Sequence, residues 1–414
     1  MSTAENVSSR IKPTLWSPLR YKDFRFLWFG ESISVCGTQF NLVALPWLIL
    51  QMSGSGLTLG EIMMVAAIPR ALLILVGGII SDRVSPRLAM LFSNLARGVI
   101  VAGLAALVWS HAVRIDLVLL LVFFFGVADA FFYPAYMAMV PRLVEADYFA
   151  PANSLLLTSS QVMVLIGPAI AGALIARAGL APAFAIDSGS FIIAAAALVL
   201  ISTQKSIAPA TAAGRPSLLS SMQEGLHYAW NDGFIYGIIL ITAMVNLAFT
   251  GTYAVGTALL ADKIFHSATS LGIMLSTSGA GAILGSVIAG LWRPSRHRGM
   301  FILAFPFVVG LGLIGIAFAA HLAEAAAIQA VIGVMNGFSS VFVTSMLQTR
   351  IEPSMMGRVF GIITLAMVGL LPFSFLLGGV LSKFGVMVLF LISGGFLLVT
   401  GIVSSSIRQL RHFD

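Results

Sequence analysis

The chain consists of long apolar segments separated by short polar or charged ones. A helix needs about 20 mainly apolar residues to cross the hydrocarbon core of a bilayer. Apolar residues run continuously through each segment and do not alternate with period two, which favours membrane-spanning helices over a transmembrane barrel. Twelve spans are predicted, near residues 26–51, 57–81, 87–110, 115–140, 150–177, 181–202, 235–261, 268–292, 299–320, 323–348, 356–382 and 385–407.

The longest polar interruption, from about Ser202 to Asp232, divides the predicted spans into two groups of six. Within it, the apolar residues of 217–232 share roughly one helical face, which predicts a short amphipathic helix on the cytoplasmic surface. The expected organisation is a cytoplasmic N-terminal segment (1–25), a six-helix bundle (26–202), a cytoplasmic linker with an amphipathic helix (203–234), a second six-helix bundle (235–407) and a cytoplasmic tail (408–414).

The two halves resemble each other in sequence. Gly126 and Asp129 of the fourth span correspond to Gly333 and Asn336 of the tenth, 207 positions later. A second match at an offset of 206 relates 172–179 to 378–385. Two matches at nearly one offset, close to half the chain length, indicate an internal duplication. Duplicated halves with a binding site between them are typical of secondary transporters.

Composition agrees with a membrane protein, because 59% of the residues are hydrophobic and only 9% are charged, against about 25% charged in soluble domains. The single cysteine, Cys36, excludes an intrachain disulfide and any site built from several thiolates. The six histidines show no metal-ligand spacing, and no GxxxxGK[ST] phosphate loop is present. We therefore expect no metal, no cofactor and no enzymatic activity.

The basic residues predict the orientation in the membrane. If the N-terminus is cytoplasmic, 17 of the 23 lysines and arginines lie on that side, 4 lie on the other, and Arg70 and Arg97 lie within spans. This bias follows the positive-inside rule and supports both the span count and a cytoplasmic location of both termini. The first 20 residues are polar and basic, so no signal peptide is expected. We expect a multi-pass protein of the cell membrane that does not bind nucleic acid.

A loop motif between the second and third spans resembles that of the major facilitator superfamily, G-x-x-x-D-R-x-G-R-R/K. Gly78, Asp82, Arg83 and Arg87 match it, whereas Ser85 and Pro86 depart from it. The stretches 21–30, 44–47, 132–135 and 152–155 resemble the bacterial macrolide-efflux and enterobactin-exporter branch of that superfamily. The resemblance implies an all-α membrane protein, with twelve transmembrane helices in two pseudo-symmetric six-helix bundles around a central cavity.

The fifth span carries Gly167, Pro168 and Gly172, which resemble the Gly-Pro motif of antiporters in the form GPxxxG. We expect Pro168 to weaken or kink the helix because it lacks a backbone donor. Small neighbours would permit close helix packing with no role in coupling, and this alternative stays open. One departure concerns the arginine that many proton antiporters carry in the fourth span, because Val122 stands at that position.

Ionisable residues in the middle of spans are costly and usually mark a pathway. Asp129 is the first candidate for a proton- or substrate-linked carboxylate, and Asn336 keeps its polar shape in the second half without being able to titrate. Glu31 is the second candidate, and Arg70 and Arg97 are candidates for attracting an anionic group. The alternative for all four charges is a set of structural ion pairs that hold the helices together.

Asp82 and Arg83 are candidates for a gate whose contacts differ between two conformations. The sequence as a whole predicts a secondary transporter that exports an amphipathic small molecule, such as a drug, macrolide or siderophore, probably in exchange for protons and as a monomer. An importer or a lipid flippase of the same fold, and a non-transporting membrane sensor or scaffold, remain alternatives. Direction and substrate class rest on the resemblance.

Overall fold

The structure is a computed structural model that describes residues 14–83, 85–202, 218–292 and 298–406. These residues form helices and no strand. Twelve helical segments among them are long and apolar enough to cross a membrane, which confirms the predicted number of spans and the all-α fold class.

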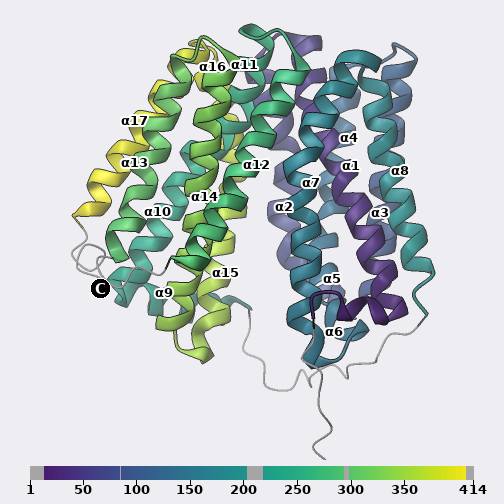
Figure 1. Cartoon of the computed structure of the whole chain (residues 1–414), viewed down its shortest axis with the longest axis vertical. Helices are drawn as coiled ribbons and strands as arrows, with labels where there is room; N and C mark the ends of the chain where they lie inside the picture. Colours follow the sequence, from purple (N-terminus) through teal and green to yellow (C-terminus); the bar gives the residue numbers. More distant parts are fainter. Residues whose placement is uncertain (1–13, 84, 203–217, 293–297, 407–414) are drawn as a thin grey trace, which may run out of the picture.

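The first half of the chain forms one bundle and the second half forms another beside it (Figure 1). The N-terminal half comprises η1 (Ser17–Arg20), α1 (Lys22–Ser53), α2 (Gly56–Arg83), α3 (Pro86–Trp109), α4 (Ile115–Ala130), α5 (Phe132–Met137), α6 (Val140–Leu143), η2 (Ala146–Tyr148), α7 (Phe149–Ala178) and α8 (Leu180–Val199). The C-terminal half comprises α9 (Leu218–Asn231), α10 (Gly233–Gly251), a π-helical turn (Thr252–Gly256), α11 (Thr257–Lys263), α12 (Ala268–Leu291), α13 (Arg298–Ala317), α14 (Leu322–Arg350), α15 (Pro353–Gly369), α16 (Leu371–Ser382) and α17 (Val386–Ser405).

Equivalent glycines in the two halves make equivalent contacts. A Cβ atom added at Gly126 of α4 would meet the backbone carbonyl of Ala66 in α2, and one added at Gly333 of α14 would meet the carbonyl of Ser278 in α12. The fourth span of each half therefore packs closely on the second span of the same half. This agreement supports the internal duplication that the sequence indicates.

Two predicted spans are interrupted near their prolines. The span over 115–140 breaks at Phe131, three residues before Pro134, and the span over 356–382 breaks at Leu370, two residues before Pro372. A proline has no N–H to donate to the preceding turn, which explains the position of both breaks. In contrast, α1 continues through Pro46 and α13 through Pro306.

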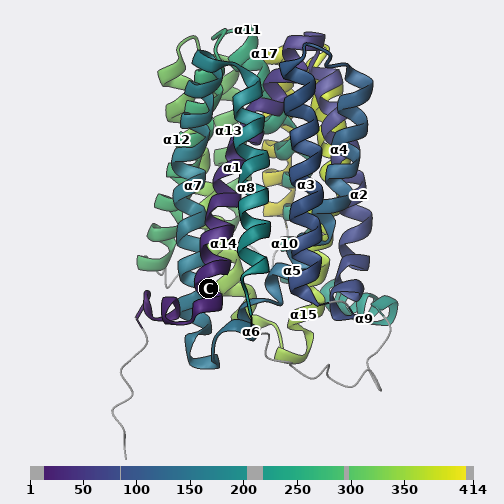
Figure 2. The same ribbon diagram turned by 90° about the vertical axis from the view of Figure 1, so that its right-hand side faces the viewer.

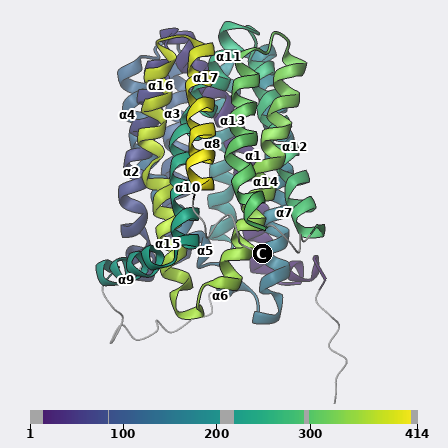
Figure 3. The ribbon, with the colours of Figure 1, turned by 90° about the vertical axis from the view of Figure 1, so that its left-hand side faces the viewer.

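Helix α9 lies across one end of the molecule, which we call the linker end (Figures 2 and 3). It is the helix expected within 217–232. Its Glu224 pairs with Arg358 of α15 at 2.9 Å, and Gly225 packs against the same arginine. Leu226 and Trp230 are exposed. The predicted apolar face is therefore only partly covered by protein in the part of α9 whose side chains are described.

The two halves meet through α7 against α12 and through α2 against α16. The Ala169 N–H donates to the Ser276 hydroxyl at 3.0 Å, and a Cβ at Gly60 would lie 2.5 Å from the carbonyl oxygen of Phe375. Both contacts lie toward the opposite end of the molecule from α9. The halves are thus joined at the opposite end, and their pockets lie nearer the linker end.

Candidate functional site

A cluster of charged side chains lies inside the N-terminal bundle. Asp129 of α4 pairs with Arg97 of α3 (Nη1–Oδ1 3.0 Å) and with Arg70 of α2 (Nη1–Oδ2 3.3 Å). The Arg97 side chain is almost fully buried, whereas that of Arg70 is half exposed. The fold thus brings together three of the predicted candidates. The geometry matches the alternative of an ion pair and joins Asp129 to both arginines.

Arg97 is held by more than its charge partner. Its Nη2 atom donates to the Asn94 side chain, 2.5 Å away, and its guanidinium carbon lies 4.1 Å from the centre of the Phe132 ring and 4.5 Å from that of Phe191. An arginine over aromatic faces gains further stabilisation in a desolvated site. Its Nε atom, however, is buried without a hydrogen-bond partner. This arginine therefore keeps unused donor capacity.

Glu31 of α1 lies within electrostatic range of both Arg97 and Asp129. It forms no ion pair or hydrogen bond with any residue that the structure describes, and it lines a pocket of about 430 Å³ in the N-terminal half. Tyr133, Tyr136 and Asn153 line the same pocket. Glu31 is therefore the carboxylate of this region that faces a cavity and remains available for a ligand or a proton.

Asp187 of α8 is a buried carboxylate that the sequence analysis did not select. It is fully buried, its Oδ2 accepts a hydrogen bond from Asn41 at 2.8 Å, and its Oδ1 has no partner. It also lies within electrostatic range of Arg97. The signal for it is the polar run 187–190, Asp-Ser-Gly-Ser, inside an otherwise apolar span.

Arg87 is the residue of the loop motif whose side chain the structure describes. It donates from Nε to the Leu198 carbonyl and from Nη2 to the Val199 carbonyl, both at 2.7 Å. A cation at the C-terminal end of a helix is favourable, so Arg87 ties the start of α3 to the end of α8. The side chains of Gly78, Asp82 and Arg83 lie outside the described residues, so the predicted gate stays a prediction.

The Gly-Pro motif lies at the contact between the two halves. A Cβ at Gly172 would lie 2.6 Å from the Ala268 carbonyl oxygen of α12, and the Pro168 carbonyl would meet a Cβ added at Gly272. Gly167 packs in the same way against Gln39 of α1. Helix α7 continues through Pro168 without a break in its assignment. These residues permit the close approach of α7 to α1 and α12.

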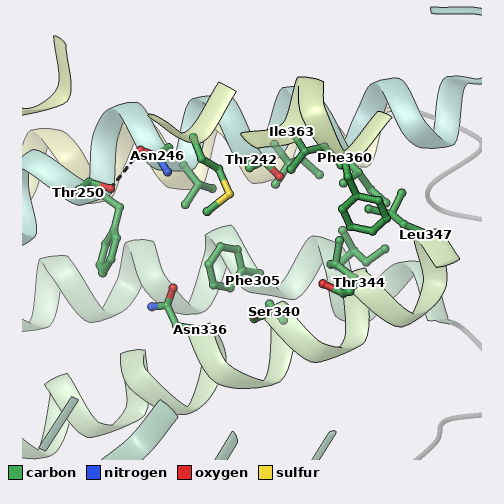
Figure 4. Close-up of a pocket in the computed structure, with 18 residues that line it drawn as sticks. Thr242, Asn246, Thr250, Phe305, Asn336, Ser340, Thr344, Leu347, Phe360 and Ile363 are labelled. Atoms are coloured by element: carbon green, nitrogen blue, oxygen red, sulfur yellow. Dashed lines mark hydrogen bonds between the residues drawn. The ribbon is translucent and has the colours of Figure 1, made fainter. Parts of the chain in front are cut away.

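A second pocket, of about 360 Å³, lies within the C-terminal half between α10, α13, α14 and α15 (Figure 4). Asn336 lines it, across from Asn246 of α10. Its polar lining consists of hydroxyl and carboxamide groups, from Thr242, Asn246, Thr250, Asn336, Ser339, Ser340 and Thr344. None of the 18 described residues around it is ionisable. Sequence analysis found Asn336 through its match to Asp129, but not the rest of this set.

A third cavity, of about 290 Å³, is lined by both halves. Gln39 and Pro168 contribute from the N-terminal half, and Tyr253 and Ser278 contribute from the C-terminal half. The cavities together place polar groups on both sides of the plane where the bundles meet.

Comparison with known proteins gives one family and consistent relatives. Residues 13–414 match the family described as transmembrane secretion effectors. The chain is 27% identical to the multidrug efflux pump Tap of Mycolicibacterium fortuitum, over 93% of this chain and 96% of that protein. It is 21% identical to macrolide efflux protein A of Streptococcus pyogenes, over 94% of this chain and 97% of that protein.

Among solved structures, the D323A mutant of the nucleoside transporter NupG superposes with a TM-score of 0.76 at 12% sequence identity, covering 93% of this chain and all of that chain. At this identity the match concerns the fold alone. The predicted twelve-helix, two-bundle fold and the resemblance to the macrolide-efflux branch are confirmed by these comparisons.

Proposed function

Because the chain belongs to the transmembrane secretion effector family of major facilitator transporters, we propose that it exports an amphipathic small molecule across the cell membrane by alternating access, in exchange for protons. The chain is a multi-pass membrane transporter and not an enzyme. Export is supported by its similarity to the multidrug efflux pump Tap and to macrolide efflux protein A.

The observation that carries the proposal is the buried charge cluster beside a free carboxylate. Asp129 is shared by Arg97 and Arg70, and Glu31 lines the adjoining pocket within electrostatic range of Arg97. Charges inside a membrane segment are costly and are retained where they act on a substrate or an ion.

In the proposed cycle, Glu31 takes up and releases the proton. When Glu31 is charged, it competes with Asp129 for the attraction of Arg97. When Glu31 binds a proton, Arg97 is left to Asp129 and Arg70 is more easily released. Because α1, α2, α3 and α4 each contribute one of these groups, a change of partners shifts the helices of the N-terminal bundle relative to one another. Such a shift biases the two access states through their differential interactions.

The distribution of contacts between the halves supports alternating access. The α7–α12 and α2–α16 contacts join the bundles toward the end opposite α9. We propose that this is the state open toward the linker end and that the linker end is cytoplasmic. The positive-inside rule supports this orientation, since Arg20, Arg87, Arg142 and Arg350 all lie at helix ends on that side.

The test is uptake of erythromycin and of a lipophilic cationic dye into inverted membrane vesicles, with and without an imposed proton gradient. Inverted vesicles present the cytoplasmic face outward, so an exporter accumulates its substrate in them. We expect gradient-dependent accumulation with the wild-type chain, and its loss with Glu31→Gln. The matched control is Glu61→Gln, which alters an exposed glutamate on α2 and should leave uptake unchanged.

Each other outcome contradicts a specific part of the proposal. Uptake that persists in Glu31→Gln with its gradient dependence intact would remove the proton site from Glu31. Accumulation in right-side-out vesicles alone would mean import. If neither compound moves in either orientation, while size-exclusion chromatography shows folded protein, broad efflux is excluded.

A further inference from the structure

The pocket of the C-terminal half is built from uncharged polar groups that point into one cavity. Asn246 of α10 and Asn336 of α14 face the cavity from opposite walls, and Ser340 and Thr344 continue the α14 wall at positions one turn apart (Figure 4). These side chains come from segments about 100 residues apart in the sequence. Their convergence is a property of the fold.

Several of these groups keep unused hydrogen-bonding capacity. Asn246 accepts a bond from Thr250 at 3.3 Å and Asn336 donates to the Ile332 carbonyl at 3.1 Å. Within the described part of the chain, Nδ2 of Asn246 and Oδ1 of Asn336 have no further partner. The Ser339 hydroxyl is buried with none. Polar groups without partners cost free energy in a membrane protein. A bound ligand or water that takes these bonds offsets this cost.

The apolar part of the wall is aromatic and aliphatic. Phe249, Phe305 and Phe360 line the cavity from three different helices, and Figure 4 shows Phe305 between the two asparagines. Carboxamides and hydroxyls beside aromatic faces suit a ring that carries hydroxyl groups at its edge and C–H groups on its faces. A charged group would find no counter-ion among the described lining residues.

The N-terminal half differs in this respect. Its pocket contains Glu31 and adjoins the cluster of Arg97 and Asp129. We propose that the C-terminal pocket binds the uncharged, hydroxyl-rich part of the exported molecule, such as a sugar ring, whereas the charge cluster of the N-terminal half serves coupling alone. This inference rests on the proposed function and adds the ligand class and its location.

The size of the cavity supports binding of part of a molecule. A volume of about 360 Å³ lies near the lower end of the range for small-molecule sites, which is about 300–1,000 Å³. The ligand would insert one hydroxylated ring between α10 and α14. The remainder of the molecule would then extend toward the cavity between the halves.

The test measures equilibrium binding separately from transport. Two radiolabelled probes bind to the purified full-length chain in lipid nanodiscs: erythromycin, and the same macrolide with its dimethylamino group replaced by a hydroxyl group. The variants are Asn246→Leu and Asn336→Leu, which keep side-chain size and remove the carboxamide, and Thr344→Val, which removes one hydroxyl. Asn231→Leu and Thr364→Val are matched controls, since both are exposed residues outside the pocket.

We expect both probes to bind the wild-type chain with similar Kd. Each asparagine variant should raise the Kd of both probes about tenfold, as expected for the loss of a buried hydrogen bond. Thr344→Val should raise it by a smaller factor, and it serves as the test if an asparagine variant does not fold. The two controls and Glu31→Gln should leave the Kd of the uncharged probe unchanged, although Glu31→Gln abolishes gradient-driven uptake.

Two results would overturn the inference while leaving the export proposal intact. The first is transport of erythromycin with a Kd that none of the three pocket variants changes. The second is a loss of affinity for the uncharged probe in the wild-type chain, because that would make the positive charge the recognised group. A wild-type chain that neither binds nor transports either probe would contradict macrolide export and this inference together.

Discussion

The guanidinium of Arg97 lies 3.0 Å from the carboxylate of Asp129, although the arginine is only 5% exposed. The two residues come from adjacent spans, α3 and α4, and Arg70 of α2 shares the same carboxylate. One carboxylate thus holds three helices of the N-terminal bundle together. Removal of Asp129 leaves a buried cation without its partner, whereas removal of Arg70 affects a half-exposed one.

We expect Asp129→Asn to destabilise the chain by about 3 kcal/mol, at the lower end for breaking a buried pair. Cys36, the sole cysteine of the chain, lies partly buried on α1, so a thiol-reactive dye can report thermal unfolding. The control is Asp116→Asn, which breaks the exposed pair with Arg114 and should not change the melting temperature. Equal melting temperatures for both variants would show that the Arg97–Asp129 pair does not support the fold.

Substitution of Glu31 should separate coupling from stability. Glu31 has no ion-pair partner among the described residues, so Glu31→Gln should leave the dye-detected melting temperature near that of the wild-type chain. Exchange of labelled for unlabelled substrate across vesicles should continue, since it needs no net proton movement, but its rate should lose its dependence on pH. A pH dependence identical to that of the wild-type chain would place proton binding at another group.

The packing of α7 against α12 should be sensitive to a single methyl group. A Cβ at Gly272 would overlap the Pro168 carbonyl, whereas a Cβ at Gly290 of the same helix meets nothing within 4 Å. Overpacking costs about 1–3 kcal/mol. Gly272→Ala should therefore weaken the joined end and reduce transport, while Gly290→Ala should leave transport unchanged.

Spin labels on α7 and α12 near their opposite-end termini provide the measurement. We expect the population with a longer inter-label distance to grow in Gly272→Ala, in a background where Cys36 is replaced by serine. The same distance distribution in Gly272→Ala, Gly290→Ala and the parent chain would show that this contact does not control the closed end.

Asp232 has two roles at the start of α10 that two substitutions can separate. Its Oδ1 accepts from the Phe234 and Ile235 N–H groups, and its carboxylate contacts Arg350 at the end of α14 (2.9 Å to Oδ2). Asp232→Asn keeps a side chain that can cap the helix but removes the charge, so it should cost little. Asp232→Ala removes both and should cost about 1–2 kcal/mol. Equal losses in dye-detected melting would assign the whole effect to the ion pair.

The span count could be predicted from the sequence because each span repeats the same requirement for about 20 apolar residues. The breaks at Phe131 and Leu370 follow from Pro134 and Pro372, but Pro46 and Pro306 lie within continuous helices. The sequence alone does not separate these two cases, because tertiary packing decides whether the free carbonyl is accommodated.

The site was predictable one residue at a time, but its arrangement was not. Hydropathy selects Asp129, Arg97 and Arg70 as costly charges within spans. It does not show that one carboxylate serves both arginines, since that depends on how α2, α3 and α4 pack. Asp187 and the C-terminal pocket were missed for a related reason. Isolated hydroxyls and amides are common in membrane helices, and only the fold shows which of them share a cavity.

The seam at the opposite end has a consequence for how readily the molecule changes shape. Where α7 meets α12 through Gly172 and Gly272, the backbones touch and few large side chains interlock. Helices in such contact can roll over one another without first disengaging large side chains. The seam therefore resembles a bearing more than a lock, and the charge cluster and the ligand are left to set the timing of the motion.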